Sequence, residues 1–328
     1  MSDHGNISIF VPHIGCPHIC SFCDQRAISG HTTAPSAQDV IDACLEAKEK
    51  KGKEHLELAF FGGSFTGLRR EYMVELLEAP QRFMGTLIEG IRLSTRPDFI
   101  DADILSLLKN YHVTSIELGS QSMINEVLEA NLRGHTREDT IEAANLIKSF
   151  GFSLGLQMMT GLYKSSYERD IETAKELIAL KPDTVRIYPT ITIDKTYLAE
   201  LYMNGEYQPP RLKETVALCA ELVPMFQEAG IKVIKTGLHP SDDLEEKMVA
   251  GPYHRAFGEL VLSKIMLQKA LPLLYEKGKG HVTVSVAKGE TSKFVGQKRQ
   301  NMLYLKDLGF DVKIIENPNQ KPLSPSIL

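Results

Sequence analysis

Three of the five cysteines in this 328-residue chain fall within eight residues, at Cys16, Cys20 and Cys23. Pro12 and Pro17 place the segment in a loop, because proline lacks the N–H group that a helix or strand interior needs. Three neighbouring thiols cannot pair evenly as disulfides. Cysteine thiolates are ligands of zinc and of iron–sulfur clusters, so the spacing predicts a metal or cluster site.

Two kinds of site fit this loop. A structural zinc ion takes four ligands, and His13 or His18 could complete a set of three cysteines. Three thiolates alone fit a [4Fe–4S] cluster whose fourth iron stays open to bind a substrate or cofactor. The residue types leave both sites open.

The rest of the chain indicates what positions this loop. Short apolar segments alternate with longer amphipathic ones. The expected strands are 7–12, 56–63, 91–98, 113–122, 152–162 and 183–189, and the expected helices are 37–50, 69–84, 99–111, 137–150 and 166–180. Strands separated by helices pair in parallel through right-handed crossovers. The pattern predicts an α/β fold, an open six-unit (βα)6 partial barrel with reacting groups at the carboxyl ends of its strands.

Beyond residue 189 the alternation is less regular. We expect a helical region over 196–229, a strand over 231–240, and then helices at 256–277 and 292–307, strands at 281–287 and 310–315, and an extended tail. This divides the chain into a partial barrel (1–195), a segment that completes the core (196–265), and a small α/β extension with the tail (266–328).

Composition excludes several classes of protein. The chain is 43% hydrophobic and 24% charged, which is ordinary for a globular protein. It has no long apolar segment, and its N-terminus, MSDHGNISIF, lacks the features of a signal peptide, so we expect no membrane contact and a cytoplasmic location. The net charge of −5 argues against a wide nucleic-acid footprint but leaves room for a local basic patch.

CxxxCxxC after the first strand of a six-unit βα chain, with Phe22 between the last two cysteines, resembles the radical S-adenosylmethionine (radical SAM) superfamily. The resemblance implies that Cys16, Cys20 and Cys23 hold a [4Fe–4S] cluster and that SAM chelates its fourth iron. It further implies that one electron, from a reductant such as ferredoxin or flavodoxin, cleaves SAM to a 5′-deoxyadenosyl radical that abstracts hydrogen from a substrate.

The stretch FFGGSFTG supplies Gly62, Gly63 and Ser64 at the end of the second strand. Adjacent glycines let a ligand approach the backbone closely. The resemblance makes this the stretch that contacts the amino group of SAM. Ser64 departs from the acidic residue that the family often has there, so backbone carbonyls must carry more of the contact.

Polar residues also occupy the later strands. The resemblance nominates Glu117, Gln121 and Gln157 for contacts with the ribose and carboxylate of SAM, with Arg186 and Tyr188 as weaker candidates. A charge inside a barrel is costly unless it is paired or used. A buried ion pair between Arg96 and Glu117 is therefore the structural alternative to a ligand contact.

Within the superfamily, GGSFTG, STRPD, IELGSQS, LQMMTGL and VRIYPT resemble the radical SAM domain of the Elongator catalytic subunit and, more distantly, oxygen-independent coproporphyrinogen oxidase. The likeness covers most of residues 7–265. We expect no acetyltransferase chemistry, because only about sixty residues follow the similar region. RNA, as in tRNA modification, is the favoured substrate. A small metabolite, and a zinc- or cluster-stabilised RNA-binding module without turnover, are the alternatives.

Other residues of reactive type have simpler interpretations. Cys44 and Cys219 lie among apolar residues and are expected in the core. His239 and His254 are candidate acid–base groups, although a lone histidine is usually structural.

A basic cluster precedes the last helix. It consists of Lys288, Lys293, Lys298 and Arg299. It fits either a solvated helix start or a contact with RNA phosphates.

We expect replacement of Cys16, Cys20 or Cys23 by Ala to remove cluster binding, because only these three share a loop. Cys44→Ala and Cys219→Ala are the matched controls and should keep it. Iron and sulfide analysis of anaerobically purified variants checks this, and equal loss of iron from a control would contradict it.

Overall fold

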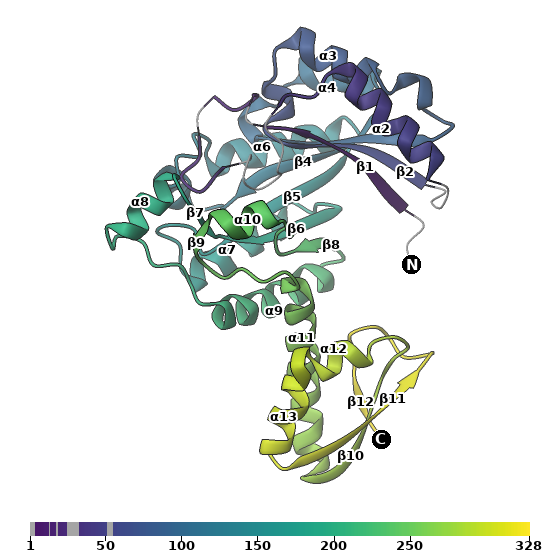
Figure 1. Cartoon of the computed structure of the whole chain (residues 1–328), viewed down its shortest axis with the longest axis vertical. Coiled ribbons are helices and arrows are strands. Elements are labelled where there is room, and N and C mark those ends of the chain that lie inside the picture. The colour runs from purple at the N-terminus through teal and green to yellow at the C-terminus, as the bar shows by residue number, and fades with distance from the viewer. Residues whose placement is uncertain (1–3, 13, 18, 25–32, 51–54) are drawn as a thin grey trace.

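A computed structural model covers the whole chain and describes residues 4–12, 14–17, 19–24, 33–50 and 55–328. Seven parallel strands form one curled sheet that leaves a half-barrel open on one side (Figure 1). In spatial order they are β1 (His4–Val11), β2 (His55–Gly62), β3 (Ile88–Thr95), β4 (Val113–Gln121), β5 (Ser153–Thr160), β6 (Thr184–Pro189) and β8 (Lys232–Thr236). Each strand pairs with the next one of the sheet along the chain, so all the carboxyl ends meet at one rim.

Helices connect the strands across the outer face of the sheet (Figure 1). The helices that pack in the main core there are α2 (Ala37–Glu49), α3 (Arg70–Glu78), α4 (Ala102–Asn110), α6 (Arg137–Ser149), α7 (Tyr167–Ala179) and α9 (Leu212–Glu228). Helices α5 (Asn125–Ala130) and α8 (Tyr197–Met203) instead contribute to the apolar cluster that contains Cys20 and Phe22. Short 3-10 turns follow β2 and β3, as η1 (Phe65–Gly67) and η3 (Pro97–Phe99), and η2 (Gln81–Phe83) follows α3. The α/β partial barrel predicted from the sequence is confirmed.

The sheet differs from the prediction in having a seventh strand. The segment expected as a separate strand at 231–240 pairs parallel to β6 as β8. The helical region expected over 196–229 is two helices, α8 and α9. Pro209 and Pro210 lie between them, and proline both removes a helical hydrogen bond and disfavours helix in the residue before it.

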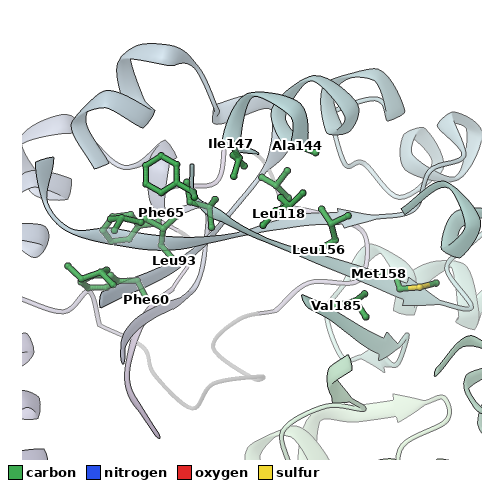
Figure 2. Close-up of a cluster of buried hydrophobic side chains, with 14 of the residues drawn as sticks. Phe60, Phe65, Leu93, Leu118, Ala144, Ile147, Leu156, Met158 and Val185 are labelled. Atoms are coloured by element: carbon green, nitrogen blue, oxygen red, sulfur yellow. The ribbon is translucent and has the colours of Figure 1, made fainter. Parts of the chain in front are cut away.

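The main core lies between the sheet and its helices (Figure 2). Alternate residues of each strand supply it, and the figure labels Phe60, Phe65, Leu93, Leu118, Ala144, Ile147, Leu156, Met158 and Val185. Because successive strand residues point to opposite faces, the residues between them face the concave side. Cys44 and Cys219 are both fully buried in this core, as predicted.

The long helix α11 connects the half-barrel to the C-terminal unit, which lies below the half-barrel in the view of Figure 1. Before it come α10 (Asp242–Lys247) and the small antiparallel pair β7 (Thr192–Ile193) and β9 (Met248–Ala250). The unit contains α11 (Phe257–Lys277), β10 (Gly280–Ala287), α12 (Thr291–Val295), η4 (Gln297–Arg299), α13 (Gln300–Asp307), β11 (Phe310–Asn317) and β12 (Ser326–Ile327). The tail, expected to be extended, ends in β12, which pairs antiparallel with β10.

Helix α11 belongs to two apolar clusters. Its residues up to Ile265 pack in the main core, whereas Met266 and Leu274 pack with Phe294 and Phe310 in a second core. The division of the chain at residues 195 and 265 stays a prediction. No helix in the described part of the chain is long and apolar enough to cross a membrane.

Phe310→Ala should loosen the C-terminal unit while leaving the half-barrel folded. Phe310 is 2% exposed and packs in the second core, so its truncation should cost that unit about 3–5 kcal/mol. Hydrogen exchange followed by mass spectrometry should show lost protection in β10 and β11. Equal loss of protection in β2 to β5 would show that the two cores unfold as one.

Candidate cluster and cofactor site

The cysteine loop follows β1 at the carboxyl rim, where the sequence placed it. Cys16 and Cys23 are half-buried and Cys20 is buried, and all three are free thiols. The backbone N–H of Cys23 donates to the carbonyl of Cys20 at 3.1 Å. Burial raises the pKa of the Cys23 thiol, and Cys20 and Cys16 raise it further because they lie close by.

The loop is fastened to two neighbouring segments. The Ser21 hydroxyl donates to Asn131 Oδ1 at 2.8 Å, and the Ser21 N–H donates to the Asn131 carbonyl at 3.1 Å. The carbonyl of Ser21 accepts from Leu198 N–H at the start of α8. Cys20 and Phe22 pack in an apolar cluster, which also contains Val127, Met159, Leu162, Leu198, Leu201 and Tyr207.

The loop also touches the chain that leaves β2, backbone against backbone. A Cβ on Gly15 would lie 1.9 Å from the Ser64 carbonyl oxygen, and one on Gly67 would lie 2.2 Å from the Gly15 carbonyl oxygen. The Cys16 Sγ is 3.8 Å from the Ser64 Oγ. The cysteine loop and the glycine-rich stretch therefore form one surface, which side chains at Gly15 and Gly67 would separate.

The structure gives a reason for the glycines of FFGGSFTG that does not involve a ligand. Gly62 has φ +109°, and its Cβ would lie 2.7 Å from the Val11 carbonyl oxygen. Gly63 donates its N–H to that same oxygen at 2.7 Å. The close approach at Gly62 is thus occupied by the end of β1.

Sequence reasoning missed one residue of this site, Arg133. It is 5% exposed, its Nη1 donates to Cys20 Sγ at 3.1 Å, and its Nη2 donates to the Gly119 carbonyl. A buried guanidinium beside a cysteine sulfur fits a negatively charged, thiolate-bound group. The signal was available in NLRGHT, where an arginine follows the short helix after β4.

Two polar residues border Arg133. Burial, and to a smaller extent the positive charge of Arg133, lower the pKa of His135 to about 3, so this histidine is neutral near pH 7. Gln121 is 9% exposed, has a left-handed φ of 63°, and its Oε1 has no hydrogen-bond partner among the described residues. A Cβ on Gly119 would contact both Gln121 Nε2 and Arg133 Nη2, so the two side chains are neighbours. An unpartnered buried oxygen beside a cation fits a polar ligand that carries both donors and acceptors.

A row of charged side chains crosses the concave face. Glu117 is 1% exposed and accepts from Arg92 Nη1 at 3.1 Å, from Arg186 Nε at 2.6 Å and Nη2 at 3.0 Å, and from Gln157 Nε2 at 3.0 Å. Arg92 also pairs with Glu57 at 2.8 Å. Burial opposes ionisation of Glu117, but its hydrogen bonds and charge contacts with Arg186, Gln157 and Arg92 outweigh burial and lower its pKa.

The ion pair between Arg96 and Glu117, which was the alternative to a ligand contact, is not formed; Glu117 pairs with Arg92 and Arg186. Arg96 lies past the end of β3, at the start of η3, and its Nη2 bonds Asp98 Oδ2 at 2.8 Å. Strand alternation stops at Thr95, so it cannot place Arg96 on the concave face. Glu117 and Gln157 lie together in the row, whereas Gln121 lies beside Arg133.

The remaining candidates lie elsewhere or outside the description. His13 and His18 fall outside the described residues. His254 Nδ1 accepts from the Ala256 N–H, which is a structural contact. In the described part of the chain, no three His, Cys, Asp or Glu side chains, the three loop thiols included, lie close enough together to hold a single metal ion. The cysteines of a [4Fe–4S] cluster each bind a different iron and need not converge on one point.

The basic cluster lies on the C-terminal unit, apart from the half-barrel (Figure 1), and its predicted contact with RNA phosphates stays a prediction. Lys293 pairs with Glu290 at 3.1 Å, and Lys298 and Arg299 adopt left-handed backbone before α13.

Comparison with known proteins settles the family. Residues 10–178 match the radical SAM superfamily, which is slightly more than half of the chain. The chain belongs to this superfamily. Residues 182–266 match the radical SAM C-terminal domain. Members use a [4Fe–4S] cluster and SAM, and the chain is an enzyme of this family.

Several relatives are similar to the same region. A tRNA uridine(34) acetyltransferase of Methanocaldococcus jannaschii is 31% identical over 242 residues, 67% of this chain and 44% of that protein. Elongator complex protein 3 of Homo sapiens is 33% identical over 196 residues, 52% of this chain and 36% of that protein. The chain spans less than half the length of these relatives.

Solved structures show the same fold. The archaeal Methanocaldococcus infernus Elp3 with an N-terminal deletion superposes with a TM-score of 0.66 at 24% identity, over 83% of this chain and 64% of that one. Coproporphyrinogen III oxidase from Escherichia coli superposes with a TM-score of 0.51 at 19% identity, over 69% and 53% of the two chains.

Glu117→Gln should destabilise the fold by ~3 kcal/mol, because it leaves two largely buried arginines without their shared counter-charge. The folded-state pKa of Glu117 is lowered, so its contribution is present above the ordinary glutamate pKa of 4.5 and lost as pH falls through the lowered value. Denaturant unfolding at pH 7 and at pH 3 measures both effects.

Glu57→Gln is the matched control, since Glu57 is in the same row but 14% exposed and should cost less. If Glu117→Gln abolishes SAM binding without loss of stability, the main role of Glu117 is contact with SAM and not the pairing of Arg92 and Arg186.

Proposed function

We propose that this enzyme uses its cluster and SAM to modify an RNA, with tRNA the favoured substrate. The observation that carries the chemistry is the buried contact from Arg133 to Cys20, which sets a cation against a thiol of the CxxxCxxC loop. The likeness to a tRNA uridine(34) acetyltransferase over 67% of the chain supports the choice of RNA.

The described residues suggest how the cofactors are held. Cys16, Cys20 and Cys23 would bind the cluster, and Arg133 would balance its negative charge. When bound, reduced cluster and SAM supply a 5′-deoxyadenosyl radical that abstracts hydrogen from the substrate. An external reductant, such as ferredoxin or flavodoxin, would supply the electron.

The chain's own residues then have separate tasks toward SAM. The backbone carbonyls of Gly62, Gly63 and Ser64 would accept hydrogen bonds from the amino group of SAM. They would carry this contact because Ser64 stands where the family often has an acidic side chain. Gln121, with its unpartnered Oε1 beside Arg133, would meet a polar group of SAM. Gln157 already donates a hydrogen bond to Glu117. We therefore assign these two residues to the structure of the concave wall and not to direct contact with SAM.

Packing around the loop protects this chemistry from water. Phe22 is 8% exposed and lies in an apolar cluster with Met159, Leu162 and Tyr207. Exclusion of water prevents side reactions of a reactive intermediate.

The test is turnover by anaerobically reconstituted, reduced protein. It should form 5′-deoxyadenosine from SAM slowly alone and faster with tRNA, and nucleoside mass spectrometry should show a changed tRNA base. A variant with all three loop cysteines replaced by Ala is the control.

Three other results would redirect the proposal. A colourless protein that retains zinc and binds RNA would support the module without turnover. SAM cleavage that no RNA accelerates would point to a small metabolite. Equal turnover by the triple variant would contradict the cluster assignment.

A further inference from the structure

The charged row on the concave face ends in a cation that no carboxylate among the described residues balances. Along the sheet the row runs through Glu57 on β2, Arg92 on β3, Glu117 on β4 and Arg186 on β6. The register of β6 with β8 sets Lys235 directly beside Arg186. Paired residues on adjacent strands point to the same face, so Lys235 extends the row.

The first four members of the row neutralise one another. Glu57 contacts Arg92, and Glu117 contacts both Arg92 and Arg186. No hydrogen bond or ion pair joins the Lys235 ammonium to any of the described residues. The row therefore holds three cations and two carboxylates, and the surplus charge sits on Lys235.

This arrangement is unfavourable in the free protein. Lys235 is half-buried, and both burial and the neighbouring Arg186 charge lower its pKa. Placing an unpaired ammonium beside a guanidinium costs free energy through desolvation and repulsion. Lys232 on the same strand is exposed and carries no such cost. A cation kept in this position without a partner among the described residues points to a negatively charged ligand.

The place of β8 suggests how that ligand arrives. Strand β8 ends the seven-stranded sheet, so it borders the open side of the half-barrel (Figure 1). Lys235 is one residue from the carboxyl end of β8, near the rim that carries the cysteine loop. A chain molecule that enters through the open side would pass Lys235 on its way to that rim.

We propose that Lys235, backed by Arg186, binds a phosphate group of the substrate at the open edge of the half-barrel. The ammonium is a point-charge donor suited to phosphate oxygens, and the guanidinium adds positive potential while staying bonded to Glu117. The proposal rests on the proposed function for the choice of RNA as the source of the phosphate. Lys235 is a binding residue and takes no part in holding the cluster.

The experiment compares holoenzyme variants by fluorescence anisotropy with a labelled tRNA anticodon stem–loop at two salt concentrations. Lys235→Met should weaken binding about tenfold at low salt and reduce the slope of log K against log salt by about one. Lys235→Arg keeps the charge and should bind within about twofold of the parent. Lys232→Met removes the same charge from an exposed position of the same strand and should bind like the parent.

Stability and SAM binding separate this role from a structural one. Lys235→Met should unfold at the same temperature as the parent or higher, because it removes an unpaired half-buried charge. Its affinity for SAM by equilibrium dialysis should be unchanged. A lower melting temperature with unchanged RNA binding, or a loss of SAM affinity, would overturn the proposal.

A measurement on the parent protein covers the case in which the variant does not fold. Bound RNA should protect Lys235, but not Lys232, from an amine-reactive label detected by mass spectrometry. Equal labelling of Lys235 with and without bound RNA would overturn the inference.

The failure of this inference can be told from failure of the proposed function. If the parent binds tRNA and Lys235→Met binds it equally, only the phosphate site is wrong. If the parent binds no RNA at low salt, the RNA substrate is wrong, and uridine 5′-monophosphate against uridine becomes the probe. Phosphate-dependent binding that Lys235→Met loses would then support a small phosphorylated substrate, and its absence would reject the site.

Discussion

The site depends on a backbone contact between the cysteine loop and the chain leaving β2. Gly15 meets the Ser64 carbonyl, and Gly67 meets the Gly15 carbonyl, at separations that leave no room for a side chain. Glycine is the residue that permits such an approach. Because the contact is made by backbone atoms, it fixes the loop against the sheet without drawing on any cysteine side chain. This backbone contact therefore uses none of the three thiols.

A second constraint follows from the open shape of the half-barrel. A closed barrel fills its interior with apolar side chains, whereas this concave face carries Glu57, Arg92, Glu117 and Arg186 as a connected charged row. Glu117 is nearly inaccessible and accepts four hydrogen bonds, so it joins β3, β5 and β6 to β4 through side chains as well as through backbone pairing. Among the described residues of this row, the charges from β2 to β6 are paired and the surplus charge lies on Lys235.

Arg133 links this architecture to the chemistry of the family. The residue lies between β4 and α6, and from there it reaches both Cys20 and the carbonyl of Gly119 on β4. One buried cation therefore joins the cysteine loop to β4. Members of the radical SAM superfamily use a [4Fe–4S] cluster and SAM, and a buried cation beside a cysteine sulfur fits a negatively charged group of that kind.

Much of this protein can be predicted from its sequence because local patterns carry the information. The alternation of apolar strands and amphipathic helices predicted the six βα units, and the tight spacing of Cys16, Cys20 and Cys23 indicated the family without any knowledge of contacts. Period-two alternation is also sufficient to place residues of regular strands, such as Glu117 and Gln157, on one face of the sheet. These features are short-range, so a single sequence is sufficient for them.

The tertiary structure decided what depends on partners distant in the sequence. Arg96 appeared to face Glu117, but the strand ends before it, and Arg92 and Arg186 pair with Glu117 instead. Arg133 approaches Cys20 across 113 residues, and β8 joins the sheet after two helices. The cost of leaving Lys235 unpaired likewise exists only where β8 lies beside Arg186. Side-chain pairing and strand order arise from long-range packing, in which many partners of similar chemistry compete, and the sequence alone does not rank them.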